Sequence, residues 1–349
     1  MFISALGSIS GGANNRLGLP RVKSSIVFLV DGMGYQNLLD HPAYARNLLG
    51  LIEVKPKVLR CGFPSSTAVS LTSFGTGLRA GEHGIAGYQV LDSEGSIKNM
   101  LNGWSSEAEA AAWQSFPTVA ETSGEIRVSM VAAEEYRSSG FTAAIMRGAT
   151  FKGANDLRVR AQTAKATAST PGNLVYLYAA ELDQAAHRFG VGSPEWLAVL
   201  EEVDFVAGEL SRNDFGVLIT ADHGVINVDS RRHVILDQIA GFTDFVSYAI
   251  GDPRALFCYG DIHGASLALE QYSDLLTICT LGDLVRLGWL ERIPEIQGTL
   301  PDFVLISRGE VACYDTRTAK KQSLNMVGQH GGISDAEMRV PLVLAGGYV

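Results

Sequence analysis

The sequence predicts an α/β protein with a mostly parallel central sheet and helices on both of its faces. Short, continuous runs of apolar and β-branched residues are typical of strands that are buried on both sides. Amphipathic stretches alternate with these runs, which indicates crossover connections between parallel strands. The 349 residues are 46% hydrophobic and 19% charged, and they are expected to form one domain over residues 1–349.

The first part of the chain supplies two strands and two helices. A strand is expected at 26–30, where the run is apolar throughout, and a shorter one at 58–61, before Pro64. A helix is expected at 67–74, because glycines follow at its end. The polar, alanine-rich stretch 105–112 is typical of a helix on the surface.

The middle of the chain repeats this alternation. The apolar runs 174–179 and 217–220 predict two further core strands, and the amphipathic stretch 195–210 between them predicts a long helix. The remaining elements expected here are strands at 126–130 and 142–146 and helices at 132–138 and 155–168.

After residue 228 the alternation becomes irregular. We therefore interpret residues 228–320 as an insertion that caps the functional site, followed by a last core strand at 340–344. Within this insertion we expect strands at 245–250, 256–259 and 303–306 and helices at 266–275 and 281–287.

Composition excludes several classes of function. The net charge of −9 argues against a general nucleic-acid-binding protein, although bound cations would still allow an anionic substrate. No apolar run reaches the roughly 18–20 residues of a membrane span. Residues 1–12 lack the basic segment of a secretion signal, and the four widely spaced cysteines form no Cys-x-x-Cys pair. We therefore expect a cytoplasmic protein with reduced cysteines and without a membrane partner.

Three carboxylates and three imidazoles fall where predicted strands end. Asp31, Asp183 and Asp222 each follow a predicted strand directly or within a few residues, and ligands gather outside the carboxyl ends of parallel strands. His187 lies four residues after Asp183, which is one helical turn. With His223, His330 and the hydroxyl of Thr67, this inventory would hold two divalent metal ions, and pairs about 3.5–4 Å apart catalyse displacement at phosphorus.

Charge counting supports the same assembly. Two divalent cations bring four positive charges, and the three aspartates offset three of them. Ionised Thr67 would neutralise the last, since a hydroxyl bound to such cations loses its proton readily. Mixed carboxylate and imidazole ligands fit zinc, with manganese and iron as alternatives.

The nucleophile is expected to be Thr67, which stands at the start of a predicted helix. Amides at a helix N-terminus and the helix dipole favour a phosphoryl oxygen at that position. Ser65, Ser66 and Ser70 are the neighbouring alternatives.

Taken together, these motifs resemble the alkaline phosphatase superfamily, in particular its nucleotide pyrophosphatase/phosphodiesterase branch in a compact bacterial-type form. The similarity runs from the segment Val27-Phe28-Leu29-Val30-Asp31-Gly32-Met33-Gly34 to His330-Gly331. It implies an α/β/α sandwich and a phosphoric ester hydrolase in which the threonine attacks phosphorus, forming a phospho-enzyme that metal-activated water then hydrolyses. By this resemblance one metal would be held by Asp31, Thr67, Asp222 and His223, and the other by Asp183, His187 and His330.

One departure from this family pattern bears on the substrate. The branch often places an asparagine, which donates to a phosphate oxygen, shortly after a His-Gly-Ile segment. Here His83-Gly84-Ile85 is followed by Tyr88, which we expect to contact the substrate in its place. The expected partner is a small phosphate ester or nucleotide. A phosphomonoesterase or phosphonate hydrolase on the same scaffold, and a catalytically silent metal-binding protein, are the alternatives.

Overall fold

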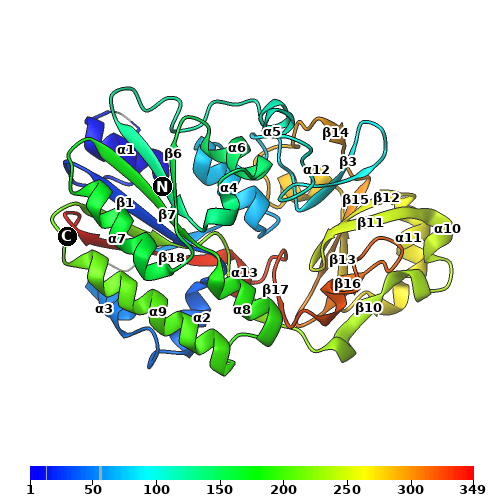
Figure 1. The fold of residues 1–349 in the computed structure, drawn as a ribbon. Coiled ribbons are helices and arrows are strands. Elements are labelled where there is room, and N and C mark those ends of the chain that lie inside the picture. Colours follow the sequence, from blue (N-terminus) through cyan, green and yellow to red (C-terminus); the bar gives the residue numbers. More distant parts are fainter. Residues whose placement is uncertain (13, 55–56) are drawn as a thin grey trace.

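The computed structural model describes residues 1–12, 14–54 and 57–349 (Figure 1). A seven-stranded sheet forms the centre of the described part, in the order β2-β18-β8-β1-β7-β5-β6. Its strands are β1 (Ser25–Val30), β2 (Val58–Arg60), β5 (Arg127–Ala132), β6 (Thr150–Gly153), β7 (Asn173–Ala179), β8 (Gly216–Thr220) and β18 (Arg339–Gly346). The sheet is mostly parallel, because only β18 runs against its neighbours β8 and β2.

Strand β1 occupies the middle of the sheet, with β7 and β8 paired in parallel on its two sides. All six of its residues are buried, as a strand covered on both faces requires. Its side chains alternate between two cores. Val27 and Leu29 pack into one core, and Ile26, Phe28 and Val30 pack into the other.

Helices cover both faces and complete the three layers that the sequence predicts (Figure 1). The layer on the side of Leu29 consists of α1 (Phe2–Ser10), α4 (Thr67–Thr76), α5 (Glu107–Trp113) and α6 (Gly140–Met146). The opposite layer consists of α2 (Tyr35–Asp40), α3 (Arg46–Val54), α7 (Leu157–Ala168), α8 (Glu181–Phe189) and α9 (Pro194–Ser211).

The segment between β8 and β18 builds a second, antiparallel sheet, at the right of Figure 1. Its strands are β11 (Val246–Asp252), β12 (Ala255–Gly260), β13 (Leu276–Cys279) and β15 (Phe303–Ser307), and its helices are α10 (Phe242–Phe245), α11 (Ile262–Ala268) and α12 (Leu281–Arg286). This sheet has a core of its own, which includes Val246, Leu256 and Phe303.

Small elements connect the two sheets. Strands β3 (Gln89–Asp92) and β4 (Ile97–Asn99) form a three-stranded sheet with β14 (Gly298–Thr299). There are also two two-stranded sheets, one of β9 (Ile226–Asn227) with β17 (Gly328–Gln329) and one of β10 (His233–Ile235) with β16 (Ala312–Tyr314). The short helix α13 (Asp335–Met338) precedes β18.

The sequence prediction was wrong between residues 132 and 153. The run 142–146, predicted as a strand, lies in helix α6, and the expected helix at 132–138 is reduced to a 3₁₀ turn at Glu134–Tyr136. A short apolar run does not distinguish a buried helix from a strand. The helix is favoured because the Ser139 side chain accepts a hydrogen bond from the Thr142 amide at its start.

Other departures are smaller. The stretch 266–275 is not one helix, since α11 ends at Ala268 and a 3₁₀ turn follows at Glu270–Tyr272. Helices α1, α2 and α3 were not predicted at all. All four cysteines are free, and within the described ranges no helix is both long and apolar enough to cross a bilayer.

Candidate metal centre and active site

The three predicted aspartates meet at one edge of the central sheet. Asp31 directly follows β1, Asp222 follows β8 after one intervening residue, and Asp183 lies in the first turn of α8, after β7. Because β7, β1 and β8 are adjacent, their carboxyl ends place these side chains together. All three are buried, with exposed fractions between 3% and 7%.

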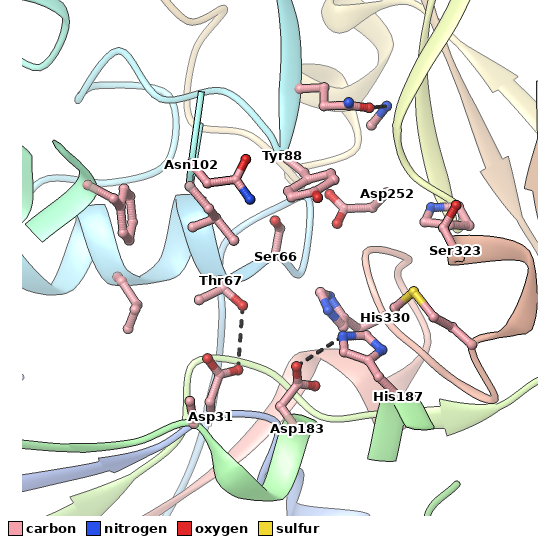
Figure 2. A pocket seen from close by; sticks show the side chains of 18 of the residues that line it. Asp31, Ser66, Thr67, Tyr88, Asn102, Asp183, His187, Asp252, Ser323 and His330 are labelled. Carbon is pink, nitrogen blue, oxygen red and sulfur yellow. Dashed lines mark hydrogen bonds and ion pairs between the residues drawn. The ribbon is translucent and has the colours of Figure 1, made fainter. Parts of the chain in front are cut away.

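Asp183, His187 and His330 form the first group of potential metal ligands. One donor atom of each lies within 4.8 Å of the others. The Nε2 atom of His187 is 3.0 Å from Oδ2 of Asp183 (Figure 2). Each imidazole is oriented through its Nδ1 atom, by the Gly328 carbonyl for His187 (2.8 Å) and the Ser65 carbonyl for His330 (2.9 Å). This arrangement leaves both Nε2 atoms for a ligand, as in metal-binding histidines.

The second group surrounds His223. Its Nε2 atom lies 3.3 Å from Oδ1 of Asp31, 3.5 Å from Oδ2 of Asp222 and 3.1 Å from Oγ1 of Thr67. The Thr67 hydroxyl also lies 3.4 Å from Oδ1 of Asp31. The backbone amide of Gly32 donates to Oδ1 of Asp222 at 3.2 Å, which fixes that carboxylate. The sequence-predicted ligands therefore converge from distant segments of the chain.

The second group differs in one detail from the predicted partition. Donor atoms of Asp31, Asp183 and His223 lie within 4.8 Å of one another, so Asp183 belongs to both groups. Asp222 contacts His223 from the other side. Asp183 thus lies between the two groups, where a carboxylate would face both cations.

Burial and neighbouring charges shift the pKa values of several side chains in this site. Burial and the Asp31 carboxylate raise the pKa of Asp222 well above its usual value. Burial lowers the pKa of His223, but the surrounding carboxylates, Asp222 first, raise it to about 10. Burial raises the pKa of Asp183, but the neighbouring imidazoles, His187 first and then His330 and His223, together outweigh burial and lower that pKa overall. Burial and the charge of His223 hold the pKa of His330 well below its usual value.

Two buried carboxylate oxygens test whether the site fits metal ions. Oδ1 of Asp183 and Oδ2 of Asp222 are buried, and neither has a hydrogen-bond partner among the described residues, although Oδ2 of Asp222 lies 3.5 Å from Nε2 of His223. An unpaired buried carboxylate oxygen is costly unless a cation binds it. The donors are carboxylate oxygens and imidazole nitrogens, which suit zinc and similar divalent ions. The residues present therefore fit a pair of divalent cations.

Thr67 is the hydroxyl residue that contacts both Asp31 and His223. It is the first residue of α4, and its side chain is buried, with 8% of its surface exposed. Ser65, one of the alternatives, has a structural role instead. Its hydroxyl donates to the Gly332 carbonyl at 2.7 Å and accepts from the Gly331 amide at 3.1 Å. These bonds connect the start of α4 to the loop that carries His330.

A cavity of about 620 Å³ opens above these residues and is lined from both sheets. Tyr88, the predicted substrate contact, lies in its wall (Figure 2). Sequence reasoning missed two further polar residues of this wall, Asn102 and Asp252. Asp252 lies two residues after the strand expected at 245–250, but that strand was assigned to the cap and not to the central sheet, and Asn102 belongs to no recognisable motif.

Two supporting contacts were also missed. The Tyr178 hydroxyl, on β7, donates to Oδ2 of Asp31 at 2.5 Å and orients that carboxylate. The buried guanidinium of Arg254 forms a bidentate pair with Glu337 (2.8 and 2.9 Å), whose Oε1 atom accepts from the Gly332 amide. This pair connects the antiparallel sheet to the loop after His330.

Comparisons with known proteins agree with this geometry. A family model described as type I phosphodiesterase / nucleotide pyrophosphatase matches residues 25–332. The chain is 25% identical over 252 residues to an uncharacterized pyrophosphatase/phosphodiesterase of Schizosaccharomyces pombe. That match covers 67% of this chain, which spans about half (50%) of the yeast protein's length.

Solved structures show the same fold. Murine ectonucleotide pyrophosphatase / phosphodiesterase 5 superposes with a TM-score of 0.70 at 16% identity, covering 92% of this chain and 88% of the murine one. An inactive form of the murine protein in complex with AMP gives 0.69 at 16% identity, with 93% and 88% covered. The human counterpart gives 0.69 at 16% identity, with 92% and 87% covered.

Proposed function

Because the chain belongs to the type I phosphodiesterase / nucleotide pyrophosphatase family, we propose that it hydrolyses phosphodiesters, nucleotide derivatives among them, at a two-metal site. This membership agrees with the resemblance of its motifs to the alkaline phosphatase superfamily. The observation that carries the proposal is the convergence of Asp31, Asp183 and Asp222 with three histidines. Two of these aspartates have a buried carboxylate oxygen without a hydrogen-bond partner among the described residues.

The ligands divide into two sets in this proposal. One cation would be held by Asp31, Thr67, Asp222 and His223, and the other by Asp183, His187 and His330. Bound there, divalent cations supply Lewis acidity, which favours ionised hydroxyl and water and neutralises phosphoryl charge. Zinc suits these donors best, and manganese and iron suit them as well.

Thr67 acts as the nucleophile in this proposal. Its Oγ1 atom loses its proton to water and forms a bond to phosphorus while the bond from phosphorus to the leaving oxygen breaks, and that oxygen takes up a proton from water. Water then hydrolyses the threonine phosphate and regenerates the hydroxyl. Asp31 and His223 hold Oγ1 in place from two sides, at 3.4 and 3.1 Å, which lowers the entropic cost of the attack.

Tyr88 and Asn102 contact the phosphoryl group in this proposal. Both line the cavity on the side opposite Asp31 and Asp183 (Figure 2). Burial raises the pKa of Tyr88, so its hydroxyl remains protonated and able to donate. The amide of Asn102 offers a second donor from a different loop. Asn102 thereby supplies the group that the family pattern places where this chain has Tyr88.

Residues 228–320 act as a cap in this proposal. Ala249, Ile250 and Leu256 of its antiparallel sheet line the same cavity as Thr67. An ester group extending from phosphorus would contact this apolar surface. The AMP complex of the murine structural neighbour makes a nucleoside group a reasonable first candidate.

The test is hydrolysis by purified protein loaded with zinc or manganese. We expect turnover of an aryl phosphodiester and of a dinucleotide, and loss of both activities in Thr67→Ala. If the loaded protein hydrolyses no phosphodiester, phosphomonoester or dinucleotide, the proposal fails, and the silent metal-binding alternative gains support.

A further inference from the structure

Asp252 is a buried carboxylate of the active-site cavity that the proposed reaction does not use. It ends β11 in the antiparallel sheet, and only 5% of its surface is exposed. Its Oδ2 atom is buried without a hydrogen-bond partner among the described residues. Figure 2 shows it beside Tyr88, across the cavity from Asp31 and Asp183. An acceptor in this position needs an explanation, because an unpaired buried polar group is costly.

The backbone leaves space for this carboxylate beside the metal ligands. Gly331 follows His330 directly and has a φ of +113°. A Cβ atom at Gly331 would lie 2.4 Å from the Cβ atom of Asp252, so a side chain there would displace the carboxylate. Ser66, which precedes Thr67, and Tyr88 line the same cavity as Asp252 (Figure 2).

We propose that Asp252 determines specificity by excluding a free, charged phosphoryl oxygen from its side of the cavity, so that the enzyme prefers diesters to monoesters. This inference rests on the proposed function. A monoester presents three unesterified oxygens. In this inference the proposed ligands, Thr67, Tyr88 and Asn102 bind the two unesterified oxygens of a diester, and the esterified oxygen that is retained lies on the side of the cavity that Asp252 lines.

The charges around the cavity favour this interpretation. Among the described residues that line it, the acidic side chains are Asp31, Glu135, Asp183, Asp252 and Asp315, and Lys320 is the one lysine or arginine. Lys320 is exposed, whereas Asp252 is buried and therefore poorly screened. An anionic oxygen near Asp252 is repelled, whereas an esterified oxygen carries no full charge. Like charges within about 6 Å at an effective dielectric of about 20 change affinity by tenfold or more.

The experiment compares two substrates with the same leaving group, 4-nitrophenyl phosphate and 4-nitrophenyl ethyl phosphate, in zinc-loaded protein above pH 8, where the Asp252 carboxyl is ionised although burial raises its pKa to about 7. Asp252→Asn preserves shape and removes the charge. We expect kcat/KM for the monoester to rise about tenfold, while kcat/KM for the diester changes by less than about threefold. Glu135→Gln removes a charge from the exposed rim of the same cavity and is the matched control, for which no change in the ratio is expected.

A binding measurement separates this role from a structural one. In the Thr67→Ala background, calorimetry with inorganic phosphate is expected to show about tenfold tighter binding after Asp252→Asn. If Asp252 had a purely structural role, Asp252→Asn would lower kcat/KM for both esters equally and would not tighten the binding of inorganic phosphate. If the wild type hydrolyses the diester and Asp252→Asn leaves the ratio of the two kcat/KM values unchanged, this inference alone is overturned. A wild type that hydrolyses neither ester overturns the proposed function, and this inference with it.

Discussion

The imidazole rings of His223 and His330 are stacked, with centroids 3.8 Å apart and planes inclined by 17°. The two rings belong to different proposed ligand sets, so the two proposed cation sites lie next to each other at this stacked pair of rings. Burial, and then the charge of His223, holds the pKa of His330 well below its usual value, whereas the carboxylates around His223, Asp222 first, raise the pKa of His223 against the effect of burial to about 10. His330 is therefore neutral, the form that binds metal.

The first prediction concerns the nucleophile. Thr67→Ala is expected to abolish diester hydrolysis and covalent labelling of the protein by substrate, because the proposed attacking oxygen is removed. Most proposed metal ligands remain, so metal content measured by elemental analysis should stay above half of the wild-type value. Thr67→Ser is the matched control and should retain measurable activity. Full activity of Thr67→Ala would assign the attack to another group.

The second prediction concerns the orientation of Asp31. Tyr178→Phe removes the hydroxyl that donates to Oδ2 of Asp31 and should weaken metal binding by about 10- to 100-fold. Tyr176→Phe is the control, since the buried Tyr176 hydroxyl has no partner among the described residues. Competition with a chelator measures both affinities. Equal affinities in the two variants would show that Tyr178 does not support the site.

The third prediction concerns the buried pair between Arg254 and Glu337. Removing one partner leaves an uncompensated buried charge, so Glu337→Ala should lower the free energy of unfolding by about 3–5 kcal/mol. The double variant Arg254→Met/Glu337→Leu should lose less, because no isolated charge remains. Urea denaturation measures the free energy of unfolding of the wild type, of Glu337→Ala and of the double variant. A double variant less stable than Glu337→Ala would contradict this account.

The fourth prediction concerns stability and pH. Burial raises the pKa of Asp252 to about 7, from a usual value of 3.8. A carboxyl with a raised folded pKa costs no stability below pH 4, and its ionisation lowers stability as pH rises to about 7. Asp252→Asn removes that cost, so the metal-free variant should exceed the wild type by about 4 kcal/mol above pH 8 and by nothing near pH 4.

Thermal unfolding across this pH range measures the difference. Asp274→Asn, at an exposed carboxylate of the same segment, is the control and should show no pH-dependent gain. If Asp252→Asn is no more stable than the wild type at pH 8, Asp252 is not a strained carboxylate.

The convergence of the three aspartates was predictable from sequence because each follows a strong apolar strand, and parallel strands bring such positions to one edge. Asp252 and Asn102 were not, because they reach the cavity from the antiparallel sheet and an irregular loop, whose placement depends on tertiary contacts. Tyr178 lies within a correctly predicted strand, but its bond to Asp31 requires knowing that β7 pairs with β1. Helix α6 was mistaken for a strand because its apolar run is too short to reveal a period.

The most direct test of the two-metal site is anomalous diffraction at the zinc edge from crystals grown with zinc. We predict two peaks in the cavity, one bordered by Asp183, His187 and His330 and the other bordered by Asp31, Asp222 and His223, with Thr67 next to the second. A single peak outside these groups, or no peak at either group at saturating zinc, would contradict the account.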